Sequence, residues 1–185
     1  MNLRSQLEMY NPCCEQEARD LALILNCLSE RDIFLRQNLR SHMTASAWIV
    51  NRDRTRVLMA YHNLYQSWAW LGGHADGEED LLAVALREAR EESGLQHVQP
   101  VSEEIFSVEV LTVDGHVKRG QYVPSHLHLN VTYLLEADET DALFAKSDEN
   151  SGVRWFALEE ALEACSEPWM AEHVYSKLNR KLQAL

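Results

Sequence analysis

The sequence predicts an α/β fold of the α+β type, in which helices cover a mixed β-sheet. Short β-rich runs stand on both sides of one strongly helical segment, and the order β, β, helix, β, β, helix is typical of a sheet packed between helices. The chain has 185 residues, of which 46% are hydrophobic. This length allows one substantial core and is short for two independent enzyme domains. We therefore expect a main domain at residues 41–185 and a helical extension at residues 1–40.

The extension is predicted to be helical between residues 15 and 39, with a break near residues 29–32 that gives a helix pair. Apolar residues recur there at helical spacing, at Leu21, Ile24, Leu25 and Leu28. The segment contains no recognisable chemistry. We expect it to pack against the main domain or to form the contact of a homodimer.

The main domain alternates between β-rich and helical runs. Strands are predicted at residues 44–51, 57–62, 67–71, 104–113, 126–135 and 152–156. Helices are predicted at residues 79–93, 158–165 and 169–182. A loop is expected at residues 72–78, where Gly72 and Gly73 allow the backbone to approach a metal or a phosphate closely.

The charge of the chain limits its partners. There are 29 acidic and 17 basic residues, for a formal net charge of -12, which disfavours long nucleic acids and anionic membranes. A phosphate-bearing substrate would need a local cation, and a bound divalent metal supplies one. The N-terminus lacks the pattern of a signal peptide, and the four cysteines show neither zinc-ligand spacing nor the density of a disulfide scaffold. We expect a cytoplasmic protein.

Three carboxylates form an acidic ridge on the helix predicted at residues 79–93. Glu88, Glu91 and Glu92 stand at positions i, i+3 and i+4, which places them within roughly 100° of arc on one side of the helix. Crowded carboxylates repel one another, and a bound cation removes that cost. Hard oxygen ligands suit Mg²⁺ or Mn²⁺, and Mg²⁺ commonly shares its ligand shell with substrate phosphates. The ridge therefore predicts metal-dependent chemistry on a phosphate group.

The surrounding segment, LGGHADGEEDLLAVALREAREESGL, resembles the Nudix box, G-x5-E-x7-R-E-U-x-E-E-x-G-U with U an apolar residue. Every specified position from Gly73 to Leu95 is matched. The resemblance implies a Nudix-type α/β/α sandwich around a mixed sheet. It also implies that the ridge carboxylates bind metal or act as the base, that Arg87 and Glu79 orient them, and that the Gly73 carbonyl completes the metal shell.

Other candidate residues lie outside the acidic ridge. Family members often add a carboxylate from a loop ahead of the late tryptophan strand, where this chain has Asp148 and Glu149; we expect Glu149 to reach the metal. His126 and His128 share one face of a predicted strand. These two histidines and His74 either bind substrate or serve in packing.

The combined prediction is an enzyme that uses Mg²⁺, with Mn²⁺ as a substitute, to hydrolyse a phosphoanhydride bond in a small nucleoside diphosphate derivative by a metal-activated water. One alternative is a domain that senses a nucleotide metabolite without hydrolysing it. Another is a diphosphate isomerase of the same fold, which would need a cysteine and glutamate pair in the strand and box region. The sequence leaves open the substrate, the general base and the number of metal ions.

Overall fold

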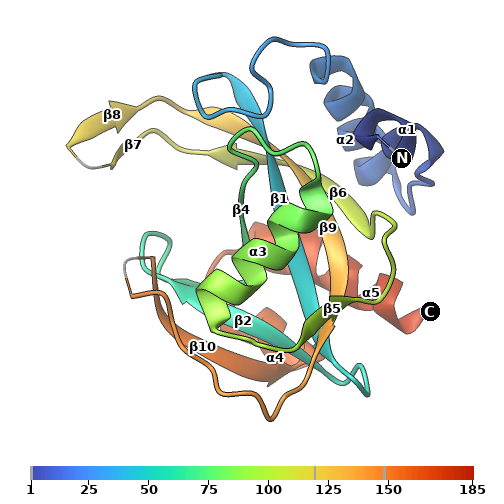
Figure 1. Cartoon of the computed structure of the whole chain (residues 1–185), viewed down its shortest axis with the longest axis vertical. Helices are drawn as coiled ribbons and strands as arrows, with labels where there is room; N and C mark the ends of the chain where they lie inside the picture. The colour runs from blue at the N-terminus through green and yellow to red at the C-terminus, as the bar shows by residue number, and fades with distance from the viewer. Residues whose placement is uncertain (1, 119, 148) are drawn as a thin grey trace.

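The computed structural model describes residues 2–118, 120–147 and 149–185, and Figure 1 shows their arrangement. Eight strands among the described residues form one mixed sheet: β1 (Ser41–Asn51), β2 (Arg56–His62), β3 (Ser67–Ala69), β4 (Leu71–His74), β5 (Val98–Pro100), β6 (Ser107–Val113), β9 (His126–Ala137) and β10 (Asn150–Ala157). Two short strands pair separately as a projecting arm: β7 (His116–Lys118) and β8 (Gln121–Val123).

The strand β1 is the centre of the sheet, and all eleven of its residues are buried. It pairs in parallel with β9 over its whole length and antiparallel with β4 over residues 44–47. Its far end pairs with β2, which is followed by β10 at the edge. The strands β5 and β6 both pair antiparallel with β9. The sheet is therefore mixed, as predicted.

Helices cover both faces of this sheet. One core cluster joins β1 to α3 (Leu81–Ser93) and to the N-terminal helices α1 (Leu3–Met9) and α2 (Glu15–Cys27). A second cluster lies on the other face, against α4 (Leu158–Ala164), the π-helical turn η1 (Met170–Tyr175) and α5 (Ser176–Gln183). Figure 1 shows α3 crossing in front of the sheet and α4 behind it. This is the expected layering of helix, sheet and helix.

The alternation of side chains along β1 divides the two faces. Ala45 and Ile49 face the core shared with α3, whereas Trp48 and Val50 face the opposite core. The first half of β1 carries polar residues on that opposite face, at His42, Thr44 and Ser46. This face is thus apolar at one end and polar at the other, and the polar end forms part of a cavity.

A buried ionic network ties α2 to the sheet and to α5. Glu17 and Glu109 are 0% exposed, and Lys177 places its Nζ 2.9 Å from Glu109 Oε1 and 3.5 Å from Glu17 Oε1. Lys181 adds a second ammonium 2.9 Å from Glu17 Oε1. The hydroxyl of Ser107 donates to Glu17 Oε1 at 2.8 Å. Because each buried carboxylate has a cationic partner and hydrogen bonds, the network can be buried without an isolated charge.

The second helix of the N-terminal pair was predicted wrongly. The helix α2 ends at Cys27, and residues 28–40 turn without forming another helix. Asp32 has a φ of 58°, and the N–H of Met43 donates to the carbonyl of Ile33 at 2.8 Å. Ile33 is buried by this contact with β1, and an apolar residue buried in a turn gives the same sequence signal as one on a helix.

The loop predicted at residues 72–78 was wrong at its beginning. Gly72, Gly73 and His74 belong to β4, because they pair with residues 44–46 of β1. The strands β5, β7 and β8 were not predicted, since runs of three residues are too short to show a period. The predicted helix at residues 169–182 is divided into η1 and α5.

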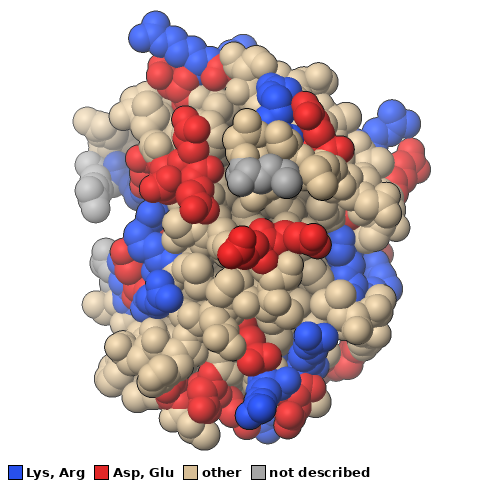
Figure 2. Space-filling model, turned by 45° about the vertical axis from the view of Figure 1, so that its right-hand side comes forward, with Lys and Arg blue, Asp and Glu red and all other residues tan. Residues whose placement is uncertain are grey.

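Figure 2 shows one face of the molecule, on which charged side chains of both signs are spread. There, Lys and Arg side chains are interspersed with Asp and Glu and form no continuous basic surface. None of the described helices is both long and apolar enough to cross a membrane.

Replacing Lys177 with Met should strongly destabilise the fold. The change leaves Glu109 without its buried cation, and breaking a buried ion pair from one side costs about 3–5 kcal/mol. Urea unfolding of the full chain measures the loss. Arg19→Met is the matched control, because Arg19 pairs with Glu15 at the surface, with side chains 80% and 83% exposed, and should change stability little. Equal stability of the two variants would show that the network contributes nothing.

Glu17 should make the fold acid-sensitive. Burial alone would raise the pKa of Glu17, but hydrogen bonds from the Cys13 N–H, Lys181 and Tyr10 outweigh it and lower the pKa from 4.5 to about 2. The stability from Glu17 is therefore present above pH 4.5 and is lost as the pH falls towards about 2. Unfolding free energies at about pH 6 and about pH 3 should differ more for the native chain than for Glu17→Gln. An equal pH dependence of both proteins would contradict this assignment.

Candidate active site

A cavity of about 960 Å³ opens between α3, β4 and the β7–β8 arm. Its lining includes the three carboxylates of the acidic ridge, Glu88, Glu91 and Glu92, and six histidines, of which His42, His74, His126 and His128 lie close together. The cavity thus contains both groups of residues that the sequence singled out, together with His42, which sequence reasoning did not select.

The helix α3 holds the acidic ridge in place through its ends and its apolar face. Asp80 caps the first turn, because its side chain accepts a hydrogen bond from the N–H of Ala83 at 3.1 Å. Gly94 ends the helix with a φ of 75°. Leu81, Val84 and Ala89 are buried against the sheet, so the ridge lies at the edge of the packed face.

The carboxylate of Glu88 packs directly against Gly73 of β4. A Cβ at Gly73 would stand 2.5 Å from Glu88 Cδ. Arg87 donates to Glu88 Oε1 at 2.9 Å and to the His74 carbonyl at 3.4 Å, and its Nε lies 3.9 Å from Glu91 Oε1. Arg87 therefore connects the ridge to the end of β4, and its orienting role stays a prediction.

Glu92 is the most deeply placed carboxylate of the ridge, at 6% exposure. Its Oε2 accepts a hydrogen bond from the Gly72 N–H at 2.9 Å, and its Oε1 accepts one from Asn150 Nδ2 at 3.2 Å. Burial raises the pKa of Glu92 to about 7; the two hydrogen bonds oppose this rise, and the charges of Glu88 and Glu149 add to it. A proton or a bound cation would neutralise the buried negative charge of Glu92 near neutral pH.

Glu149, in the loop before β10, is connected to the ridge through Lys146. Lys146 Nζ lies 2.9 Å from Glu149 Oε2 and 3.7 Å from Glu91 Oε2, so one ammonium bridges the loop and the helix. Asp148, the other acidic candidate of this loop, lies outside the described residues. The oxygen donors of Glu88, Glu91, Glu92 and Glu149 are of the hard type that Mg²⁺ and Mn²⁺ prefer.

Glu79 occupies a different position from the other box residues. It precedes α3 and is exposed, and within the described parts of the chain it has no ion pair or side-chain hydrogen bond to Arg87. Its orienting role stays a prediction.

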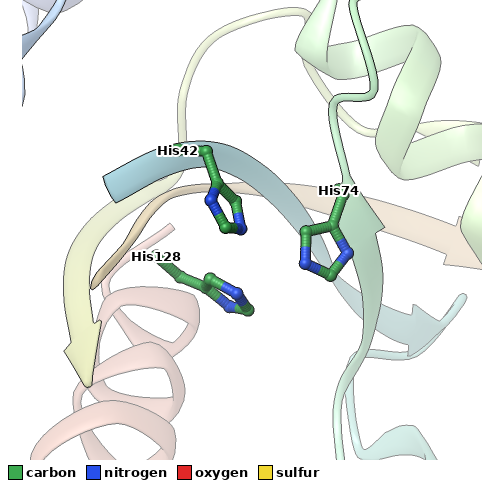
Figure 3. Close-up of side chains that lie close together, drawn as sticks. All are labelled: His42, His74 and His128. Carbon is green, nitrogen blue, oxygen red and sulfur yellow. The ribbon is translucent and has the colours of Figure 1, made fainter. Parts of the chain in front are cut away.

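The four histidines form a compact group on the other face of β4. His42 of β1 stands beside His128 of β9 in the parallel register, and β4 brings His74 opposite Thr44. The ring centroid of His42 lies 5.1 Å from that of His74, 4.8 Å from that of His126 and 5.0 Å from that of His128. Figure 3 shows the rings of His42, His74 and His128 pointing toward one another from three strands.

Burial keeps the rings of His42, His74 and His128 uncharged. Burial, followed by the charge of Arg36, lowers the pKa of His74 to about 3. Burial, followed by the neighbouring His74 and His42, lowers the pKa of His128 to about 2. The pKa of His42 is lowered as well, mainly by burial. These rings are therefore neutral at physiological pH.

Sequence reasoning missed His42, Lys146 and Asn150. His42 lies near the start of β1, whose partners are distant in the sequence, whereas Lys146 lies in the loop before β10 and Asn150 is the first residue of β10, 58 residues beyond Glu92. Only the strand pairing and the position of that loop reveal them. A weak signal was present in the sequence, because His42, Thr44 and Ser46 are alternate residues of one strand and therefore form a polar face.

An acidic helix set against a glycine strand of a mixed sheet is the arrangement of a NUDIX domain. A sequence model of the NUDIX domain matches residues 40–177. The chain therefore belongs to the NUDIX family, and the resemblance drawn from the box is confirmed.

Two curated relatives match part of the chain. The bis(5'-nucleosyl)-tetraphosphatase [asymmetrical] of Mus musculus is 31% identical over 97 residues, which are 52% of this chain and 59% of that protein. The protein of the same name from Rattus norvegicus is 30% identical over the same shares. The chain thus spans 59% of the length of the curated relatives that it matches.

Solved structures share the fold at low identity. An Ap4A hydrolase of C. elegans, in a binary complex, superposes with a TM-score of 0.54 at 21% identity, over 77% of this chain and 95% of that chain. A MutT protein from Methanosarcina mazei Go1 gives a TM-score of 0.56 at 16% identity, over the same shares. These likenesses confirm the predicted fold class.

The two glycines of β4 should respond differently to a Cβ. At Gly72 a Cβ would stand 2.6 Å from the Ala45 carbonyl oxygen and 2.7 Å from Ser46 Cα, whereas at Gly73 it would meet the movable Glu88 side chain. We expect Gly72→Ala to lower the unfolding temperature clearly, because the β1 backbone must shift. Gly73→Ala should largely keep that temperature and weaken Mg²⁺ binding, measured by calorimetry. The reverse order of the two effects would contradict the observed approach of Glu88 to β4.

Proposed function

We propose that the chain is a divalent-metal-dependent pyrophosphohydrolase that cleaves a phosphoanhydride bond in a small nucleoside diphosphate derivative. The observation that carries the proposal is the acidic ridge, in which Glu88 and Glu92 lie against the glycines of β4 and Glu91 is half exposed. The donor set fits Mg²⁺, with Mn²⁺ as a substitute, because it consists of carboxylate oxygens, and we expect the Gly73 carbonyl to complete the metal shell.

Each carboxylate of the ridge has a distinct environment in this proposal. Glu92 is fixed, because both of its oxygens accept hydrogen bonds. Glu88 is held by Arg87, and its side chain is 13% exposed. Glu91 is half exposed, at 49%, so water can reach it. We assign Glu88 and Glu92 to holding the metal, and we assign proton removal from the attacking water to the ridge as a whole.

The metal, when bound, neutralises the phosphate charge and acidifies a water molecule. The chain's own groups bind and orient the rest of the substrate. Arg87 and Lys146 lie beside the ridge and can pair with phosphate oxygens. Arg36 lines the same cavity and is held by Asp76 through two hydrogen bonds, one of 2.6 Å between Arg36 Nε and Asp76 Oδ1.

The first substrate class to test is a dinucleoside tetraphosphate. The matched relatives from Mus musculus and Rattus norvegicus carry that activity in their names. The cavity of about 960 Å³ stands at the upper end of the range for small-molecule sites, which is roughly 300–1,000 Å³. Tyr65 and Trp70 line it and offer faces on which a base could stack. The net charge of -12 supports a small substrate over a long nucleic acid.

Glu92→Gln should abolish metal-dependent turnover while leaving the fold intact. The change removes the charge of a metal ligand, and we expect kcat/KM to fall by more than about 100-fold. A panel of dinucleoside polyphosphates, nucleotide sugars and ADP-ribose with Mg²⁺ or Mn²⁺, read by released nucleotide, measures the effect. Glu163→Gln on α4 is the charge-matched control and should retain full activity.

Two results would count against this function. Full Mg²⁺-dependent turnover by Glu92→Gln would exclude the ridge as the catalytic centre. Tight binding of a panel compound without turnover by the native chain would instead support a sensing domain.

A further inference from the structure

The histidine group and the acidic ridge lie on opposite faces of the strand β4, although both line the same cavity. Successive residues of a strand point to opposite faces, and in β4 the Gly73 position faces Glu88 on α3 while His74 faces His42 and His128. The two groups therefore share the cavity but not their ligand atoms. The proposed hydrolysis does not require the histidines.

We propose that His42, His74 and His128 form a second metal site, which binds a divalent transition metal such as Zn²⁺ through imidazole nitrogens. One nitrogen of each ring lies within 4.8 Å of those of the other two. The three rings come from the adjacent strands β4, β1 and β9 and converge on one point (Figure 3). This inference is independent of the proposed hydrolysis.

The hydrogen bond of His42 prepares this ring as a ligand. Its Nδ1 lies 3.1 Å from the Asn38 carbonyl oxygen, which can only accept, so Nδ1 carries the proton. The Nε2 then presents a lone pair toward the group. Among the described residues it has no hydrogen-bond partner, although His42 is only 4% exposed. A buried polar atom without a partner destabilises the fold, and a bound metal ion would supply that partner. A backbone carbonyl that fixes the tautomer is the usual support of a metal-binding histidine.

His126 extends the group to a fourth ring. Its Nδ1 lies 2.9 Å from the Pro124 carbonyl oxygen, which fixes the same tautomer as in His42. Its Nε2 lies 3.3 Å from His128 Nε2. With its Nδ1 protonated, His126 accepts at Nε2, so His128 Nε2 donates this hydrogen bond. Two nitrogens bound at about 2.0–2.1 Å to a tetrahedral ion are also roughly 3.3 Å apart, so the spacing of this pair suits two ligands of one ion.

The chemistry of the group selects its ion. Imidazole nitrogens suit Zn²⁺, Cu²⁺, Ni²⁺ and Fe²⁺, whereas Mg²⁺ prefers the oxygens of the ridge. The nearby carboxylate of Asp76 is engaged by Arg36. His42, His74 and His128 supply three protein ligands, and the fourth position of a tetrahedral ion is left to His126 or to a phosphate oxygen of a substrate bound in the cavity.

The test is a Zn²⁺ titration of the chelator-treated full chain in excess Mg²⁺, which keeps the ridge occupied. Calorimetry should give one Zn²⁺ per chain, and Co²⁺ in its place should show the absorption of nitrogen coordination. His128→Gln and His74→Gln should each weaken binding at least about tenfold. His97→Gln is the matched control, because His97 pairs with Asp141 far from the group, and it should bind Zn²⁺ as the native chain does.

The outcomes separate the two sites. Glu91→Gln should impair turnover and leave Zn²⁺ binding unchanged; loss of Zn²⁺ binding in this variant would assign the ion to the ridge and overturn the proposal. Unchanged Zn²⁺ binding in folded His128→Gln and His74→Gln would also overturn it. If either variant fails to fold, the native chain decides, because the absence of saturable Zn²⁺ binding in excess Mg²⁺ rejects the site.

Discussion

The double pairing of β1 is the constraint on which the rest of the structure depends. This strand is buried along its whole length. It runs parallel to β9 on one side and antiparallel to β4 on the other. The pairing with β4 brings Gly73 under Glu88 and sets Gly72 where its N–H reaches Glu92. The same pairing sets His74 beside His42 on the opposite face. One register therefore creates both polar groups of the cavity, and a slip of one residue would turn each of them to the wrong face.

The polar face of β1, which carries Thr44 and Ser46, is connected to the buried ionic network of Glu109 and Lys177. The hydroxyls of Thr44 and Ser46 donate to Asn130 Oδ1 at 3.0 and 2.9 Å, and Asn130 Nδ2 donates to Glu109 Oε2 at 3.0 Å. Glu109 then meets Lys177, which also faces Glu17 of α2. A chain of hydrogen bonds thus connects the cavity wall to the N-terminal helices. The arrangement allows polar side chains to be buried beneath the cavity, because each described member has a partner.

Two kinds of donor stand close together in the cavity and differ in chemistry. The ridge presents crowded carboxylates, one of which has a pKa near 7 because it is buried. The histidine group presents neutral nitrogens whose pKa values burial has lowered. Burial therefore disfavours the charged form in both groups, because it raises the pKa of the carboxylic acid and lowers the pKa of the imidazoles. A hard cation suits the first group and a borderline transition metal the second.

The sequence by itself determined the helix α3, the ridge and the family, because helix periodicity and the spacing of the box are local properties. It also indicated that His126 and His128 share a face, since strand parity is local. Only the tertiary structure decided that His42 joins them, that Asn150 and Lys146 reach the ridge, and that residues 28–40 turn instead of forming a helix. These features arise from contacts between residues far apart in the chain. Such contacts depend on strand register and on the burial of polar groups, which no local spacing encodes.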